Sequence, residues 1–256
     1  SSINLAAKIV TAMKIRRAFL EIDSPQGPKT YDLNVDRVNS FDELYVDFHL
    51  TLEYGGERYT VFLHPKQDLV VKRLDIQFEL VAQPDTRFFA NGYQSWSESR
   101  LLPVHGDIPR LRRLAKPFMG HYGDEYIGGI PRKKGCLHSW TYTYLTDHSD
   151  QVRFWGSTNE STGFTLFLYD QPNGIFTARK DLENLALTHS FPALEFWTGQ
   201  GSETSMFDAW FTAVGRIFNS PNTSDFNSPN TSDFNSPATS ERIKNSLYNN
   251  TLNWTS

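Results

Sequence analysis

The sequence predicts a mainly all-β protein, an antiparallel sandwich with one C-terminal helix and a disordered or irregular tail. Apolar and polar residues alternate over 46–54 and again over 74–80, which is typical of strands with one buried and one wet face. Gly55-Gly56 links the first run to the apolar run 59–63, as a hairpin turn would. A helical spacing of apolar side chains begins at Ser205.

The strands of the first half follow in order from about Lys14. The run 46–54 predicts one strand, 59–63 its hairpin partner and 74–80 the next. Phe88-Phe89 is expected to end a further strand. This places a polar and aromatic stretch directly at the end of a sheet.

That stretch is Asn91-Gly92-Tyr93-Gln94-Ser95-Trp96-Ser97. Asn-Gly readily adopts positive φ, so the strand can end sharply and place Tyr93, Gln94 and Trp96 at the rim of the sheet. Flat aromatic rings bind the apolar C–H surface of a sugar, and amides bind its hydroxyls. The alternative is a core tryptophan behind a hairpin, since most Trp and Tyr side chains are largely buried.

Residues 98–135 are rich in Pro and Gly and show neither a strand nor a helix period. The composition predicts a long loop excursion, and long ordered loops are often functional. Its candidates for polar chemistry are His105, Asp107, His121, Asp124 and Glu125.

Strands are expected to resume at Leu137. The later ones are predicted at 137–144, 152–155, 163–169, 175–178, 185–187 and 194–197, with a turn at 171–174. His138, Trp140, Tyr142 and Tyr144 share one parity of the first of these runs. Their aromatic face is either a sugar platform or packed sandwich core.

The predicted helix begins with a capping-box-like pair, Ser205 and Asp208. Its broad apolar stripe should pack against the sheet and end near Phe218. The stripe contains Met206, Phe207, Trp210, Phe211, Ala213, Val214 and Ile217.

The tail has a different composition. Residues 218–225 repeat as 226–233, and a linker of Asn, Ser, Pro and Thr over 218–240 cannot bury a core. Its glycosylation-like triplets arise easily in such a composition and do not indicate secretion. Residues 241–256 form a separate C-terminal segment, and residues 1–13 an N-terminal extension.

Bulk properties exclude several classes. A net charge of −4 argues against a general nucleic-acid binder, and no run of 18 apolar residues indicates a membrane span. The one cysteine, Cys136, allows no intrachain disulfide and no cysteine zinc site. A single cysteine fits a reducing compartment, so we expect a cytoplasmic protein.

No constellation of residues by itself identifies a reaction. A glycosidase needs two carboxyls on opposite sides of one bond, which the adjacent Asp124 and Glu125 provide poorly. A mutarotase-like enzyme needs a general acid and base, and a metal site needs gathered ligands. The acid–base candidates are His105, His121, His138 and Glu195, and the metal-ligand candidates are His105, Asp107, His121 and Asp124. Neither set has a diagnostic spacing, so we expect no metal or cofactor.

A family resemblance rests on four stretches in the same order. Residues 89–97 resemble a motif in the N-terminal β-domain of family 36 α-galactosidases. The other three are Leu137-His138-Ser139-Trp140-Thr141-Tyr142, then Gly156 to Phe164, then Asp208-Ala209-Trp210-Phe211. The resemblance covers roughly residues 14–216.

In that family the domain is a β-supersandwich over what would here be 14–217, and a (β/α)₈ barrel with two catalytic aspartates follows it. The last residues here, Asn253-Trp254-Thr255-Ser256, resemble the start of such a barrel. The repeat tract over 218–240 departs from the family pattern. The resemblance therefore implies that the barrel and both catalytic aspartates are missing from this chain, and we expect no catalytic residue in it.

The resemblance implies a non-catalytic domain of an enzyme that hydrolyses melibiose- or raffinose-type α-galactosides. Its partners would be the missing barrel, a galactoside at the shared pocket and, in a homo-oligomer, further subunits. Trp96 would help to shape the substrate pocket, with Tyr93 and Gln94 beside it. The alternatives are a stand-alone carbohydrate-binding sandwich and a mutarotase-like sugar enzyme.

Overall fold

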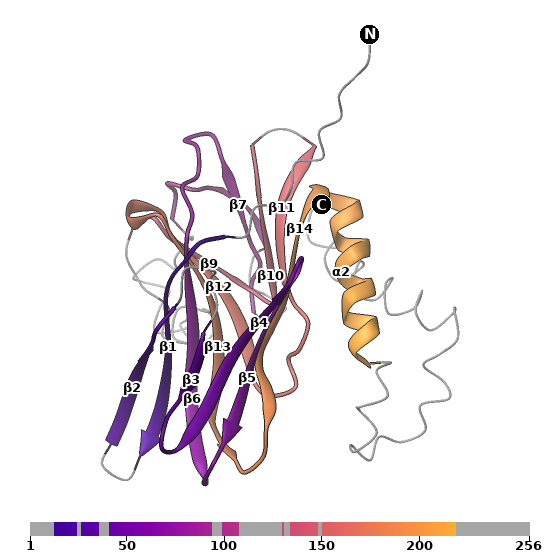
Figure 1. Cartoon of the computed structure of the whole chain (residues 1–256). Helices are drawn as coiled ribbons and strands as arrows, with labels where there is room; N and C mark the ends of the chain where they lie inside the picture. The colour runs from indigo at the N-terminus through magenta and orange to yellow at the C-terminus, as the bar shows by residue number, and fades with distance from the viewer. Residues whose placement is uncertain are drawn as a thin grey trace, which may run out of the picture.

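The fold is a two-sheet antiparallel β structure with one long helix (Figure 1). The computed structural model describes residues 13–24, 27–35, 41–93, 99–107, 130, 134–147 and 150–218. The expected N-terminal extension, apart from Met13, and the expected segments beyond Phe218 lie outside these residues. The prediction of an all-β sandwich with a C-terminal helix is confirmed.

The first sheet has six strands. Its order is β2 (Gly27–Leu33), β1 (Ile15–Ser24), β6 (Leu69–Glu79), β13 (Ile175–Leu187), β12 (Phe164–Asp170) and β9 (Cys136–Trp140). A 3₁₀ turn, η3 (Gln171–Asn173), joins β12 to β13, and Gly174 ends it with a left-handed φ of 61°. The turn expected at 171–174 is therefore present.

The second sheet has eight strands. Its order is β3 (Asp42–Leu44), β4 (Phe48–Gly55), β5 (Arg58–Pro65), β14 (Phe191–Ser202), β11 (Gln151–Ser157), β10 (Tyr142–Thr146), β7 (Arg87–Ala90) and β8 (Arg100–Pro103). The hairpin of β4 and β5 turns at Gly56, which has a φ of 69°. Strand β8 lies within the stretch that the sequence predicts as loop.

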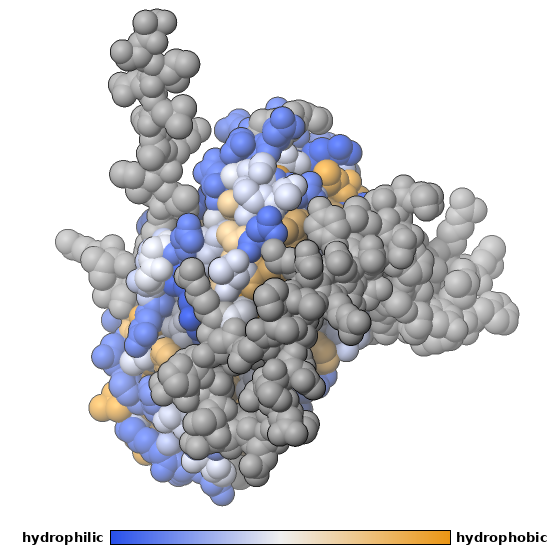
Figure 2. Space-filling model, turned by 90° about the vertical axis from the view of Figure 1, so that its right-hand side faces the viewer, coloured by the Kyte–Doolittle hydropathy of each residue, from blue (hydrophilic) through white to orange (hydrophobic). Residues whose placement is uncertain are grey.

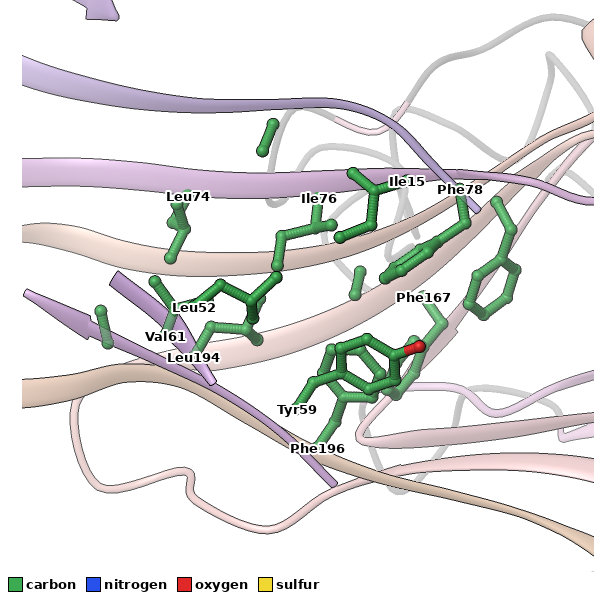
Figure 3. Packing of buried hydrophobic residues seen from close by; sticks show 14 of the residues in the cluster. Ile15, Leu52, Tyr59, Val61, Leu74, Ile76, Phe78, Phe167, Leu194 and Phe196 are labelled. Carbon is green, nitrogen blue, oxygen red and sulfur yellow. The ribbon is translucent and has the colours of Figure 1, made fainter. Parts of the chain in front are cut away.

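The core lies between the sheets, where strand alternation sends apolar side chains inward from both (Figure 3). Leu74, Ile76 and Phe78 of β6 face Val61 and Phe196 of the other sheet. All five side chains are completely buried. Burying one such side chain contributes about 1.5–3 kcal/mol, so this interlayer packing stabilises the sandwich.

Residues 137–144 form two strands rather than one. Thr141 adopts a φ of 65°, which is rare for a β-branched residue. The chain therefore leaves β9 in the six-stranded sheet and enters β10 in the eight-stranded sheet. The expectation of one continuous strand was wrong at this residue.

Helix α2 (Glu203–Phe218) packs on the eight-stranded sheet beside β14 and β11 (Figure 1). Trp210 donates from Nε1 to the Ser157 carbonyl at 2.7 Å. Ser202 caps the helix, because its hydroxyl accepts the Ser205 N–H at 3.3 Å. The expected Ser205–Asp208 capping pair therefore lies inside the first turns instead of at the cap.

The side of the molecule on which α2 lies is mixed in character, with blue hydrophilic areas and smaller orange ones (Figure 2). Among the described residues, no helix is long and apolar enough to cross a membrane.

Candidate functional site

Asn91 joins the end of β7 to β9. Its backbone N–H donates to Ser139 Oγ at 2.8 Å, and its Nδ2 donates to the Trp140 carbonyl at 2.9 Å. Its own carbonyl accepts the Trp140 N–H at 3.0 Å. Strand β7 belongs to one sheet and β9 to the other, so Asn91 ties the two layers together where β7 ends.

Ser99 bonds back to Asn91 and Gly92 and so joins the two ends of the segment 92–99. Its hydroxyl donates to Asn91 Oδ1 at 2.9 Å and accepts the Gly92 N–H at 3.2 Å. These bonds hold residues 92 and 99 together on either side of residues 94–98. Gln94 and Trp96, two of the three predicted sugar-binding residues, lie in that segment, outside the described residues.

Tyr93, the third predicted residue, lies at the rim as expected, with 38% of its surface exposed. Its ring centre lies 4.6 Å from that of Trp140 and 5.1 Å from that of Phe164, the latter edge to face. Trp140 is buried and packs with Leu166 of β12. The partly exposed ring of Tyr93 therefore packs against a buried apolar cluster.

The four stretches that carry the family resemblance contact one another, although up to about a hundred residues separate them. Asn91 bonds to the Trp140 backbone, and the Ser157 N–H donates to the Thr141 carbonyl at 2.7 Å. Trp210 then bonds to the Ser157 carbonyl. The order of contact is 89–97, 137–142, 156–164 and 208–211, the order of the sequence.

The aromatic platform of Trp140, Tyr142 and Tyr144 does not exist. The turn at Thr141 puts Trp140 in one sheet and the two tyrosines in the other. Both tyrosines are buried: Tyr142 packs with Trp210 and Phe207 of α2, and Tyr144 stacks on Phe89 at 4.8 Å. Burial raises the pKa of both phenols, with the Glu203 carboxylate adding to it. Tyr142 and Tyr144 are therefore buried rather than a sugar platform, but they lie in the cluster that packs with α2 and not in the sandwich core between the two sheets.

The described acid–base candidates are not gathered at one point. His105 is exposed after β8, His138 is buried in β9 of the other sheet, and Glu195 is buried in β14. Glu195 is paired with Arg58 and accepts from Asn159 Nδ2 at 2.9 Å. His121, Asp124 and Glu125 lie outside the described residues.

Asp107 has a structural contact, since its carboxylate accepts the Gly135 N–H at 3.0 Å. This bond ties residue 107, which follows β8, to residue 135 at the end of the predicted excursion. Within the described ranges, no three His, Cys, Asp or Glu side chains are placed to hold a metal ion.

A buried polar network that sequence reasoning missed surrounds the 156–164 stretch. Lys180 is 1% exposed, and its Nζ donates to the Asn159 carbonyl at 2.5 Å and to Thr165 Oγ1 at 3.3 Å. Glu160 lies 3.6 Å from Nζ. Burial lowers the Lys180 pKa, and Glu160 opposes the shift. In the sequence, the network could have been found only from Lys180, a charged residue within strand β13.

A cavity of about 110 Å³ lies on the six-stranded sheet. Its lining includes Gln77, Cys136, Thr177 and Arg179. Arg179 also forms a two-pronged ion pair with buried Asp75, at 2.8 and 2.7 Å. Ligand pockets usually measure about 300–1,000 Å³, so this cavity is too small to enclose a sugar.

No family model matches this chain, and no curated protein matches it either. Several solved structures do, and those reported below are glycoside hydrolases.

One is the alpha-galactosidase TtGalA from Thermus thermophilus in complex with stachyose, with 14% identity and a TM-score of 0.33 over 64% of this chain and 32% of that one. A GH31 family sulfoquinovosidase from E. rectale matches with 10% identity and a TM-score of 0.32, covering 72% of this chain and 28% of that one. A cycloalternan-degrading enzyme from Trueperella pyogenes matches with 12% identity and a TM-score of 0.35, covering 80% and 31%. The match spans about a third of each neighbour's length. At these identities and scores the likeness does not decide the family.

Proposed function

We propose that this chain is the non-catalytic N-terminal β-domain of a family 36 α-galactosidase. The parent enzyme hydrolyses terminal α-galactosides of the melibiose or raffinose type. In this proposal a separate (β/α)₈ barrel carries the catalytic carboxylates, and the sandwich domain supplies one wall of the pocket.

The observation that supports the proposal is the contact between the four ordered stretches. Matches by chance in sequence have no reason to meet in space, whereas these join β7, β9, β11 and α2 through Asn91, Thr141, Ser157 and Trp210. Exposed Tyr93 adds a rim aromatic of the kind that stacks on sugars. Trp96 is proposed to contact the galactoside, with Tyr93 and Gln94 beside it.

The first test is hydrolysis of p-nitrophenyl α-galactoside by the purified chain, with a full-length family 36 enzyme as the positive control. We expect no nitrophenol release above background, because in this proposal the barrel carries the catalytic carboxylates. Release at a rate near that of the full-length enzyme would sink the proposal.

The second test concerns the pocket wall. The purified chain is mixed with a family 36 barrel that lacks its own sandwich domain. We expect a gain of α-galactosidase activity with the wild-type chain and a smaller gain with Trp96→Ala. Equal gains in activity with the wild-type chain and with Trp96→Ala would show that Trp96 is not part of the substrate site. No gain with either protein would count against the barrel as the partner.

A stand-alone sugar-binding module predicts a different result. Galactose titration followed by tryptophan fluorescence would then show a saturable change that Trp96→Phe abolishes. We expect no change at millimolar galactose, because half of the proposed pocket belongs to the barrel.

A further inference from the structure

Two histidines face each other on the outer surface of the eight-stranded sheet. His49 of β4 is directly opposite His64 of β5, and their ring centres lie 5.4 Å apart. Phe48 and Leu63, their chain neighbours, are fully buried in the core. Because side chains alternate along a strand, both imidazoles point away from the core. They lie near the β3 edge, whereas α2 packs against β14 and β11.

Each imidazole already has one ring nitrogen held by a neighbour. His49 Nε2 lies 2.5 Å from Asp42 Oδ1, and His64 Nδ1 lies 2.9 Å from Ser190 Oγ. These partners leave His49 Nδ1 and His64 Nε2 for another ligand. Histidines that bind metals usually have this arrangement, in which a carboxylate or other polar group orients the ring through its second nitrogen.

The separation of the rings also suits a shared ion. Two imidazoles bound to one tetrahedral zinc, with Zn–N bonds of about 2.0–2.1 Å, have ring centres about 5 Å apart. The pair is accessible, since the His49 side chain is 33% exposed. Imidazole nitrogen is a preferred donor for Zn²⁺, Ni²⁺ and Cu²⁺.

We propose that His49 Nδ1 and His64 Nε2 together bind one divalent transition-metal ion on this sheet face. Asp42 and Ser190 orient the two rings, and water occupies the remaining coordination positions. No third His, Cys, Asp or Glu of the described chain converges on this point, so the site has two protein ligands. A bound ion would link β4 to β5 independently of any sugar pocket.

The test is calorimetric titration of the whole chain, carrying no histidine tag, with ZnCl₂ and with NiCl₂ at pH 7.5. We expect one saturable site, which His49→Gln or His64→Gln weakens at least about tenfold, because each removes one of two ligands. Ser190→Ala should weaken binding by about tenfold or less, as loss of a ring-orienting partner does.

His105→Gln is the matched control, because His105 is an exposed histidine that follows β8, at the opposite edge of the same sheet. It should leave the affinity unchanged. Absence of saturable binding by the wild type, or wild-type affinity in His49→Gln or in His64→Gln, would overturn the proposal. If a variant fails to fold by circular dichroism, histidine side-chain NMR of the wild type decides, since zinc must then shift the His49 and His64 signals.

Discussion

At the scale of single residues, hydrogen bonds of the partly buried Asn91 hold the end of β7 to β9. Asn91 uses both ends of its amide and both of its backbone groups. A hydrogen bond adds only about 0.5–1.5 kcal/mol to the net stability, whereas a buried polar group left without its partner costs about 1–3 kcal/mol. Removing one partner therefore destabilises the protein by more than the bond itself contributes.

We expect Asn91→Ala to lower the free energy of unfolding by about 1–3 kcal/mol, because it leaves the Trp140 carbonyl and the Ser99 hydroxyl without the amide. Urea unfolding followed by fluorescence measures the change. Asn34→Ala is the control, since the Asn34 side chain is exposed and its substitution should cost less than about 0.5 kcal/mol. Equal losses in both variants would contradict the role of Asn91.

Lys180 makes stability depend on pH in the alkaline range. Burial lowers its folded-state pKa, so the unfolded chain binds more protons in the window between that pKa and the ordinary value of about 10.5. Its contribution to stability should therefore rise with pH across this window. Urea unfolding at several pH values up to 10 should show a steeper rise for the wild type than for Lys180→Met. Parallel curves would show that Lys180 does not titrate differently on folding.

At the scale of elements, α2 packs on aromatic side chains of the eight-stranded sheet and also approaches that sheet closely at three glycines. A Cβ added to Gly156 of β11 would lie 2.6 Å from the indole of Trp210. Gly199 and Gly201 of β14 have similarly close neighbours, which include Trp197 and Met206. The helix can approach the sheet because these strand positions are glycines.

Gly156→Ala should therefore destabilise the protein by about 1–3 kcal/mol through overpacking against Trp210. Gly215→Ala is a matched control on the helix itself, because nothing lies within 4 Å of its added Cβ. That change should stabilise the protein by about 0.5–1 kcal/mol through helix propensity. Thermal unfolding of the two variants should show shifts of opposite sign; shifts of the same sign would contradict this packing.

The crossing between sheets is also local, since it depends on the positive φ of Thr141. A left-handed conformation costs a non-glycine residue roughly 1–2 kcal/mol, and glycine avoids that cost. We expect Thr141→Gly to be neutral or slightly stabilising in urea unfolding. Thr143→Gly should destabilise, because Thr143 is buried and donates to the Phe89 carbonyl at 2.7 Å. If Thr141→Gly is the more damaging change, the positive φ of Thr141 does not carry the conformational cost assigned to it.

At the scale of the whole molecule, one core extends between both sheets and couples segments far apart in sequence. Phe196 stacks on Tyr59 at 4.8 Å and meets Phe167 edge to face at 5.9 Å. These three side chains come from β14, β5 and β12, so the core links the eight-stranded sheet to the six-stranded one.

We expect Phe196→Ala to cost about 3–5 kcal/mol, the usual loss for a large aromatic removed from a packed core. Val46→Ala is the control, because Val46 is 89% exposed and should cost less than about 0.5 kcal/mol. Both sheets should unfold together in Phe196→Ala, with coincident fluorescence and circular dichroism transitions. Separate transitions would show that the sheets are independent units.

The sequence by itself determined that this is a β protein, where most strands run and that one amphipathic helix follows them. Those features depend on side-chain alternation and spacing, which are local. It also marked the end of the strand before Asn91, and Tyr93 beyond it is exposed, but neither Asn91 nor Gly92 has the positive φ that the Asn-Gly pair predicts.

Only the tertiary structure decided which sheet each strand joins, because a period of two is the same in either sheet. One positive φ at Thr141 separated Trp140 from Tyr142 and turned an apparent platform into two buried clusters. The histidine pair is likewise invisible in sequence, because His49 and His64 become neighbours only through the register of β4 with β5.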